Sequence, residues 1–183
     1  MIFEKHYDFG DKHAFLGPSK YHWINYDEEK LASAYNNWQA AQRGTRLHEL
    51  AKELIELGIK QVNTQKTFNM FVNDALGFRM TPEQGLFYSD NCFGTADAIS
   101  FNRKKLRIHD LKNGTTKCSM VQVEIYAALF CLEYNVNPFD IEIELRIYQN
   151  DEVLVHIPDP ESITELMGII IEADKQVNEL KLL

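Results

Sequence analysis

The spacing of apolar residues changes from a helical to a strand period after residue 76, and this change limits the folds that the chain can adopt. Runs with helical spacing come first, three strand-like runs follow, and a largely apolar helix separates these from a second pair of strands. This order predicts an α/β fold in which a mixed central sheet of about five strands has helices on both faces. We expect, in chain order, a short helix through Tyr21 and Trp23, helices at 27–43, 46–57 and 67–76, strands at 86–89, 93–101 and 105–112, a buried helix at 119–134, strands at 141–149 and 152–158, and a helix at 161–181.

The composition is that of an ordinary soluble globular protein. Apolar residues make up 45% of the 183 residues and charged residues 25%, which is close to the average. No apolar run approaches the ~20 residues of a membrane span, and the first residues lack the apolar stretch of a secretory signal. The 3 cysteines have no close spacing, which is typical of the reducing cytosol. We therefore expect one continuous domain, 1–183, in the cytoplasm and without a membrane partner.

The distribution of charge matters more than its total. A formal net charge of −8 argues mildly against a nucleic-acid partner. The segment 101–120, however, holds six basic side chains and a single acidic one, Asp110. Local charge steers an anionic partner more than the net charge does. The alternative is that this segment is the solvated tip of a hairpin.

The hairpin at 93–112 contains the most informative residues. A turn centred between Arg103 and Lys104 places Asp97 directly opposite Asp110, and Lys112 then lies on the same face of the sheet. Two carboxylates facing each other destabilise a sheet unless a cation compensates them. Lys112 is one such cation, and a divalent metal ion held by two carboxylates and by phosphate oxygens is another. The alternative is a solvent-facing edge with a cross-strand salt bridge, but the apolar neighbours of the two aspartates argue against exposure.

Four short motifs occur in a fixed order along the chain. They are G-x-x-x-H at 44–48, G-x-x-D at 94–97, D-x-K-x-G at 110–114 and Q-x-x-x-Y at 122–126. Together they resemble the RecB-like branch of the PD-(D/E)XK nuclease superfamily, over roughly residues 17–150. The likeness is greatest to small phage-encoded RecB-family exonucleases, which are related to the nuclease of CRISPR adaptation. It implies a restriction-endonuclease-like core, with N-terminal helices at 18–76, a catalytic sheet and helix at 86–134, and a C-terminal hairpin and helix at 140–183.

The resemblance also implies a metal centre. The catalytic residues would be Asp97, Asp110 and Lys112, and the metal would be held by His48, Asp97, Asp110 and the main-chain carbonyl of Leu111. Oxygen ligands suit Mg²⁺ or Mn²⁺, and an imidazole shifts the preference towards Mn²⁺. The positive charge of Lys112 would orient a water molecule or stabilise charge that develops on the phosphate. No iron–sulfur cluster is expected, because the chain has one cysteine fewer than the four that such a cluster needs.

His48 and the substrate-binding candidates each have a second interpretation. His48 follows a predicted N-cap, Thr45, by three residues, and a neutral imidazole is favoured near a helix N-terminus. The alternative is a capping or core histidine. Gln122 and Tyr126 share one helix face and are substrate-binding by resemblance, although Tyr126 is nearly as well explained as a structural residue. A further phosphate contact is expected from Lys117, which lies just before this helix, where an anion is favoured. Another is expected from Arg46, for which the alternative is an ordinary surface cation.

The sequence thus predicts a metal-dependent DNA nuclease, with an exonuclease as the favoured mode. Water is the expected nucleophile, and recombination, repair or phage DNA processing is the expected setting. The partners are then DNA and either a second copy of the chain or a recombination protein. One alternative is a nuclease-derived module that binds nucleic acid or protein with little cleavage. Another is a phosphodiesterase for small nucleotides, whose substrate affinity would depend only weakly on salt.

Overall fold

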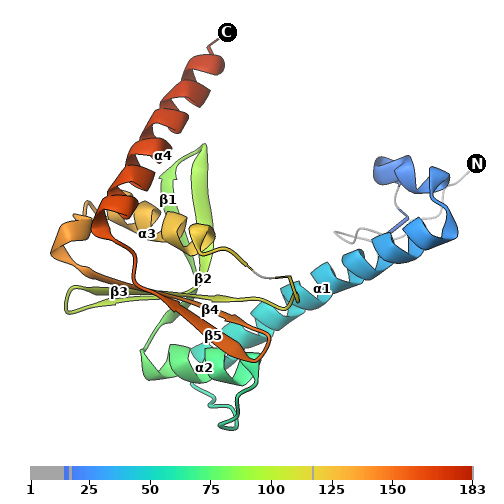
Figure 1. Ribbon diagram of the computed structural model, residues 1–183, viewed down its shortest axis with the longest axis horizontal. Helices are drawn as coiled ribbons and strands as arrows, with labels where there is room; N and C mark the ends of the chain where they lie inside the picture. Colours follow the sequence, from blue (N-terminus) through green and yellow to red (C-terminus); the bar gives the residue numbers. More distant parts are fainter. Residues whose placement is uncertain (1–14, 17, 117, 183) are drawn as a thin grey trace, which may run out of the picture. The chain divides into compact units, whose positions relative to one another are not determined.

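The computed structural model describes residues 15–16, 18–116 and 118–182 (Figure 1). The chain divides into two compact units, Met1–Arg43 and Gly44–Leu183. The described part of the first unit contains a 3-10 helix, η2 (Pro18–Asn25), and the beginning of helix α1 (Glu28–Glu56). The second unit contains the end of α1 and all remaining helices and strands.

Helix α1 is continuous where the sequence predicted two helices. It runs from Glu28 to Glu56 through Gly44 and Thr45. A glycine inside a helix costs only about 1 kcal/mol, so the favourable residues on either side outweigh it. Thr45 is therefore not an N-cap, and that prediction was wrong. The predicted end of the helix is confirmed, because Gly58 has a φ of 69° and its N–H binds the Ile55 carbonyl.

The second unit is built on one five-stranded sheet with the strand order β1-β2-β3-β4-β5. Strands β1, β2 and β3 pair antiparallel, β3 and β4 pair parallel, and β4 and β5 pair antiparallel. Helix α3 (Val121–Glu133) connects the two parallel strands, as such a crossover requires. The mixed sheet of an α/β fold is thereby confirmed. The strands are β1 (Thr81–Ser89), β2 (Cys92–Asn102), β3 (Lys105–Leu111), β4 (Glu142–Gln149) and β5 (Glu152–His156).

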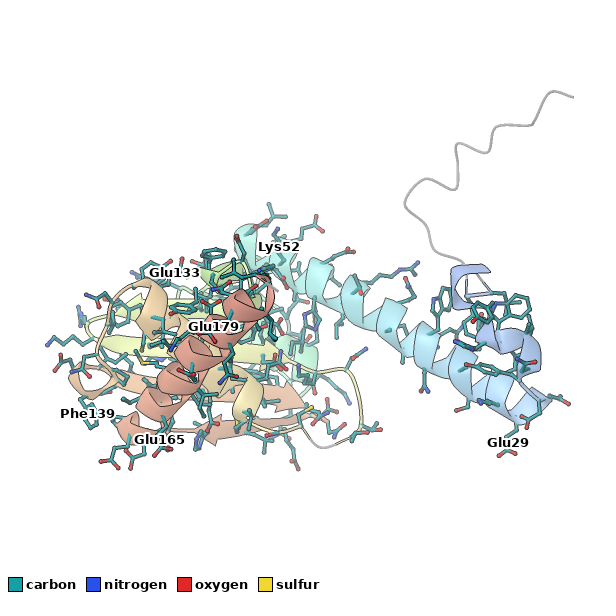
Figure 2. All side chains as sticks on the ribbon, turned by 90° about the horizontal axis from the view of Figure 1, so that it is seen from above. Glu29, Lys52, Glu133, Phe139, Glu165 and Glu179 are labelled. Carbon is teal, nitrogen blue, oxygen red and sulfur yellow. The ribbon has the colours of Figure 1, made fainter. Side chains whose placement is uncertain are left out.

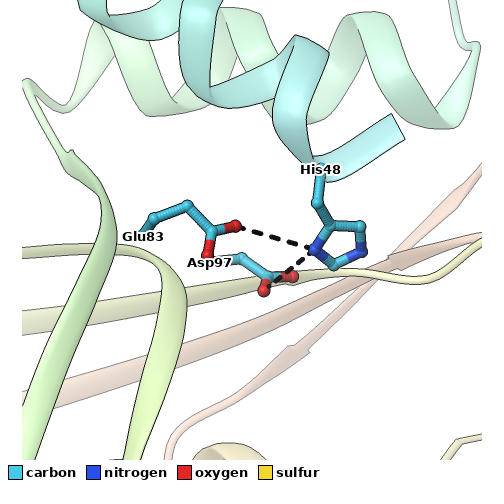
Figure 3. Close-up of side chains that lie close together, drawn as sticks. All are labelled: His48, Glu83 and Asp97. Carbon is cyan, nitrogen blue, oxygen red and sulfur yellow. Dashed lines mark ion pairs between the residues drawn. The ribbon is translucent and has the colours of Figure 1, made fainter. Parts of the chain in front are cut away.

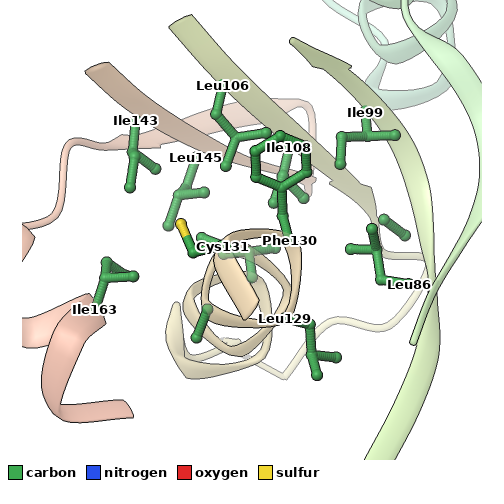
Figure 4. Packing of buried hydrophobic residues seen from close by; sticks show 14 of the residues in the cluster. Leu86, Ile99, Leu106, Ile108, Leu129, Phe130, Cys131, Ile143, Leu145 and Ile163 are labelled. Atoms are coloured by element: carbon green, nitrogen blue, oxygen red, sulfur yellow. The ribbon is translucent and has the colours of Figure 1, made fainter. Parts of the chain in front are cut away.

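Helices cover both faces of the sheet, as predicted. Helix α3 packs on one face with helix α4 (Pro160–Leu180), and the buried cluster there includes Leu106, Ile108 and Leu145 (Figure 4). Helix α2 (Thr67–Gly77) packs on the other face. The last turns of α1 join this second layer. Ala51 and Ile55 of α1 form one buried cluster with Phe71 and Val72 of α2 and Tyr148 of β4.

The exposed side of α4 carries charged residues, among them Glu165 and Glu179 (Figure 2). Within the described residues, no helix is both long enough and apolar enough to cross a membrane.

The β2–β3 hairpin has the predicted turn. Arg103 and Lys104 have φ values of 50° and 60°, as in a two-residue type I′ turn, and Asn102 pairs with Lys105. Two of the six basic residues in the segment 101–120 form ion pairs with the neighbouring strand. Lys105 and Arg107 both form ion pairs with Glu144 of β4. These two cations are thus engaged within the sheet and are not a free anion-binding surface.

A buried polar network lies on the face of β3 and β4 that also carries Arg107 and Glu144. His109 has no exposed surface, and its Nδ1 lies 3.2 Å from the Tyr148 hydroxyl, which donates to Asp74 at 2.6 Å. Because the hydroxyl proton is donated to Asp74, the Tyr148 oxygen is left to accept a hydrogen bond from the Nδ1–H of a neutral imidazole. Burial, and secondarily the charge of Arg146, lowers the pKa of His109 to about 3.

This buried histidine predicts a specific acid sensitivity. The unfolded chain binds a proton on His109 near pH 6.5 and the folded one only near pH 3, so stability is present above 6.5 and is lost as the pH falls through this window. At pH 5 the loss is about 2 kcal/mol. His109→Asn keeps an N–H for Tyr148 and removes the titration. Urea unfolding at pH 7 and pH 5 is expected to show a smaller drop for the variant, and equal drops would contradict this account.

Candidate metal centre

Three side chains from three different elements converge at one point. They are His48 of α1, Glu83 of β1 and Asp97 of β2 (Figure 3), and one ligand atom from each lies within 4.8 Å of the other two. His48 Nδ1 is 3.2 Å from Asp97 Oδ1 and 3.8 Å from Glu83 Oε1. All three residues are only partly buried, so the cluster is open to a ligand from solvent.

Asp97 is held in place by the backbone of the next strand. The β2–β3 ladder ends at the pair Ala98 and His109, and beyond it the Leu111 N–H donates to Asp97 Oδ2 at 2.7 Å. The side chain thus satisfies a backbone donor that the ladder no longer reaches. This bond fixes one carboxylate oxygen and leaves the other beside His48.

Asp110 and Lys112 form the second part of the centre. Asp110 is 2% exposed, and its Oδ1 and Oδ2 lie 3.2 and 3.0 Å from Lys112 Nζ. Oδ2 nevertheless has no hydrogen bond of acceptable geometry. Burial, and then the charge of Asp97, raises the pKa of Asp110 in spite of the lysine. Burial alone would lower the pKa of Lys112, but the charge of Asp110 raises it above its ordinary value.

The environment of His48 differs from the one predicted. His48 lies far inside the continuous helix α1, so no helix N-terminus favours the neutral imidazole. Its hydrogen bond to Asp97 outweighs burial and raises its pKa, and the backbone of Leu111 contributes in the same direction. The helix N-terminus that was expected to favour a neutral His48 is therefore absent, and the neighbouring carboxylates raise the pKa of the imidazole instead.

The predicted substrate-binding residues lie at different places. Gln122 accepts a hydrogen bond from Lys112 Nζ at 2.8 Å, which places it beside the aspartates. Tyr126 packs on β2, where a Cβ atom on Gly94 would be 2.9 Å from Tyr126 Cε1. Arg46 is exposed on α1. Lys117 lies outside the described residues. The geometry therefore gives Gln122 a place at the centre and Tyr126 a structural contact.

The glycine of the first motif also has a packing reason. A Cβ atom on Gly44 would lie 3.1 Å from the Asn113 side chain, which is tighter than most such contacts. Gly44 thus allows the loop after Lys112 to approach α1 closely. In two of the four motifs, therefore, a glycine (Gly44 or Gly94) lets its element pack closely against a neighbour because it has no side chain.

Glu83 is the residue of the cluster that the sequence analysis missed. The predicted strand began at residue 86, because Pro82 and Gly85 obscure the strand pattern, whereas β1 begins at Thr81. Extending the strand and pairing it with 93–101 would have placed Glu83 opposite Asp97. A pocket of about 560 Å³ opens at Glu83 and is lined by Gly44, Thr45, His48, Glu49, Lys52 and Glu83.

The donor atoms fit the metal ion that the resemblance implies. The carboxylates of Asp97 and Asp110 and the imidazole of His48 are ligand types that Mg²⁺ and Mn²⁺ accept. The buried Asp110 Oδ2 faces the Lys112 ammonium at 3.0 Å without a hydrogen bond of acceptable geometry, so it still has a lone pair for a metal ion. The backbone of Leu111 contacts His48, so its carbonyl is close to the same point.

Comparison with known proteins adds little to this geometry. No protein-family model and no curated protein matches the sequence. Among solved structures, the chain is similar to one described as "Crystal structure of SSO0001", with 13% identity, over 83% of this chain and 68% of that one, and a TM-score of 0.36. Because this similarity is too low to indicate a function, the function is inferred from the residues of the chain itself.

The contact between Gly94 and Tyr126 predicts a steric effect. Gly94→Ala is expected to lower the free energy of unfolding by about 1–3 kcal/mol, because the methyl group would enter the tyrosine ring. Gly85→Ala is the matched control in the same pair of strands, since nothing lies within 4 Å of its Cβ position. Tyr126→Leu should rescue Gly94→Ala in urea unfolding. If Gly94→Ala and Gly85→Ala lower the free energy of unfolding equally, the contact with Tyr126 is refuted.

The charge of Asp110 predicts a stabilising substitution. A raised pKa means that protonated Asp110 favours the fold, so this contribution is present at low pH and is lost as the pH rises through the raised pKa. At pH 7 without metal, Asp110→Asn should therefore raise the melting temperature, and the gain should shrink as the pH falls towards the range in which Asp110 is protonated. A lower melting temperature at pH 7 would show that the Lys112 ion pair dominates instead.

Proposed function

We propose that the Gly44–Leu183 unit is a metal-dependent DNA nuclease of the RecB-like PD-(D/E)XK type, acting as an exonuclease in the cytosol of a bacterium or a phage-infected host. The observation that supports this proposal is the meeting of residues far apart in sequence. His48 contacts Asp97, Asp97 binds the backbone next to Asp110, and Lys112 contacts Asp110. Each of these residues belongs to one of the motifs that resemble the family.

The residues divide the work between binding and charge stabilisation. His48, Asp97, Asp110 and the Leu111 carbonyl would hold the cation, which when bound would supply a water molecule of lowered pKa and a Lewis acid for a phosphoryl oxygen. Asp110 and Gln122 hold the Lys112 ammonium at the edge of the centre. There its fixed positive charge stabilises the negative charge that develops on the phosphate. The adjoining pocket has a volume of about 560 Å³, which lies within the usual range of pockets that bind small ligands.

Purified full-length protein with end-labelled linear DNA and covalently closed circular DNA tests the proposal. In Mn²⁺ or Mg²⁺, linear DNA should be shortened from its ends while closed circles stay intact, and a chelator should stop the reaction. Nicking of the circles would indicate an endonuclease. Binding of DNA without cleavage in either metal would contradict the proposal and favour a nuclease-derived binding module.

Lys112 provides the sharpest prediction about the reaction. Lys112→Ala is expected to reduce the cleavage rate by about 10²–10³-fold, because it removes charge stabilisation in the transition state. Mn²⁺ affinity should hold or rise, since a cation has been removed from beside Asp110. The comparison is a rate assay and a calorimetric Mn²⁺ titration on the same preparation.

Lys105→Ala is the matched control for Lys112→Ala. Lys105 lies at the other end of β3, is 28% exposed against 26% for Lys112, and also pairs with carboxylates. Its loss should leave the cleavage rate within a few-fold of the original. A Lys112→Ala protein that cleaves at the original rate would remove Lys112 from the reaction.

A further inference from the structure

Three carboxylates lie in one row across three adjacent strands. Pro82 pairs with Ala98 and Gln84 with Ala96, so Glu83 faces Asp97 across β1 and β2. Asp97 and Asp110 are the next residues beyond the last β2–β3 pair, Ala98 with His109, so they lie opposite each other. The sheet therefore extends the Asp97–Asp110 pair by a third carboxylate, which no motif marks.

The backbone at Glu83 is unusual for its place. Its φ of 48° is left-handed, a conformation that costs a residue with a side chain about 1–2 kcal/mol. In the described part of the chain, the other non-glycine residues with positive φ lie in turns or just after helices, whereas Glu83 lies inside a strand. Glycine at position 83 would avoid this cost. A role for the carboxylate explains why glutamate stands there instead.

The charges of the centre leave room for a divalent cation once His48 has given up its proton to bind it. The carboxylates of Glu83, Asp97 and Asp110 then carry three negative charges, against the one positive charge of Lys112. One divalent cation would balance the remaining two negative charges. His48 is the one cationic group within 4 Å of the Glu83 carboxylate among the described residues, and it must be neutral to bind a metal.

We propose that Glu83 is a ligand of the divalent cation, acting together with His48 and Asp97. This inference rests on the proposed function, because the cation is the one that the nuclease would use. Carboxylate count is a main determinant of divalent-ion affinity, so Glu83 raises the affinity of the centre. It also gives the pocket wall a direct part in binding, since Glu83 and His48 both line it.

The experiment is a Mn²⁺ titration of the full-length protein, followed by the electron paramagnetic resonance signal of the free ion. Glu83→Gln, which keeps the shape and removes the charge, should weaken Mn²⁺ binding at least about 10-fold. Glu49→Gln is the matched control, because it removes the same charge from the same pocket but from outside the three-residue cluster. It should change the affinity less than about 3-fold. Equal losses in the two variants would overturn the inference in favour of a general charge effect.

A glycine variant separates binding from structure. Glu83→Gly relieves the left-handed backbone, so the metal-free melting temperature should rise while Mn²⁺ affinity falls as in Glu83→Gln. If both variants bind Mn²⁺ as the original protein does, Glu83 is not a ligand.

Asp97→Asn distinguishes this failure from failure of the proposed function. If Asp97→Asn abolishes Mn²⁺ binding and Glu83→Gln leaves it intact, the inference falls and the metal centre stands. If the original protein binds no Mn²⁺, both fall. If Mn²⁺ binding depends on Glu83 but no DNA is cleaved, the inference stands and the nuclease proposal falls.

Discussion

The hydrogen bond from the Leu111 N–H to Asp97 is the contact on which the centre depends. It lies where the β2–β3 ladder ends, and it replaces a backbone pair with a side chain. One oxygen of Asp97 is thereby fixed to β3, and the other is left for His48. The same stretch of β3 carries Asp110 and leads into Lys112, so this bond sets the distance between the two halves of the centre.

The centre combines rigid support with unfavourable electrostatics. Buried clusters on both faces of the sheet hold α1, β2 and β3, and they fix the side chains that these elements carry. The raised pKa values of Glu83 and Asp110 have burial as their first cause and the charge of Asp97 as their second. The core thus stabilises an arrangement of like charges that would otherwise relax. A bound cation would remove this repulsion, so metal binding would also stabilise the sheet.

Sequence reasoning succeeded where a local pattern carried the information. The turn at Arg103 and Lys104 set the register of β2 against β3, and apolar spacing predicted the order of helices and strands. It failed where neighbours in space decide. The break predicted at Gly44 is absent because a single glycine does not end a favourable helix, and the start of β1 was missed because Pro82 and Gly85 hide an edge strand.

Local residue patterns are enough to predict the α/β class, the pairing that brings Asp97 near Asp110, and the place of Lys112 beside them. These follow from the period of a strand and the geometry of a two-residue turn, both of which are local. Packing in three dimensions alone brings His48 and Glu83 to Asp97, because these two residues come from a helix and a strand and lie 35 residues apart in the chain. It also decided that Tyr126 packs on Gly94 and that Lys105 and Arg107 pair with β4. Such contacts depend on how the elements pack, and the spacing of residues does not record this.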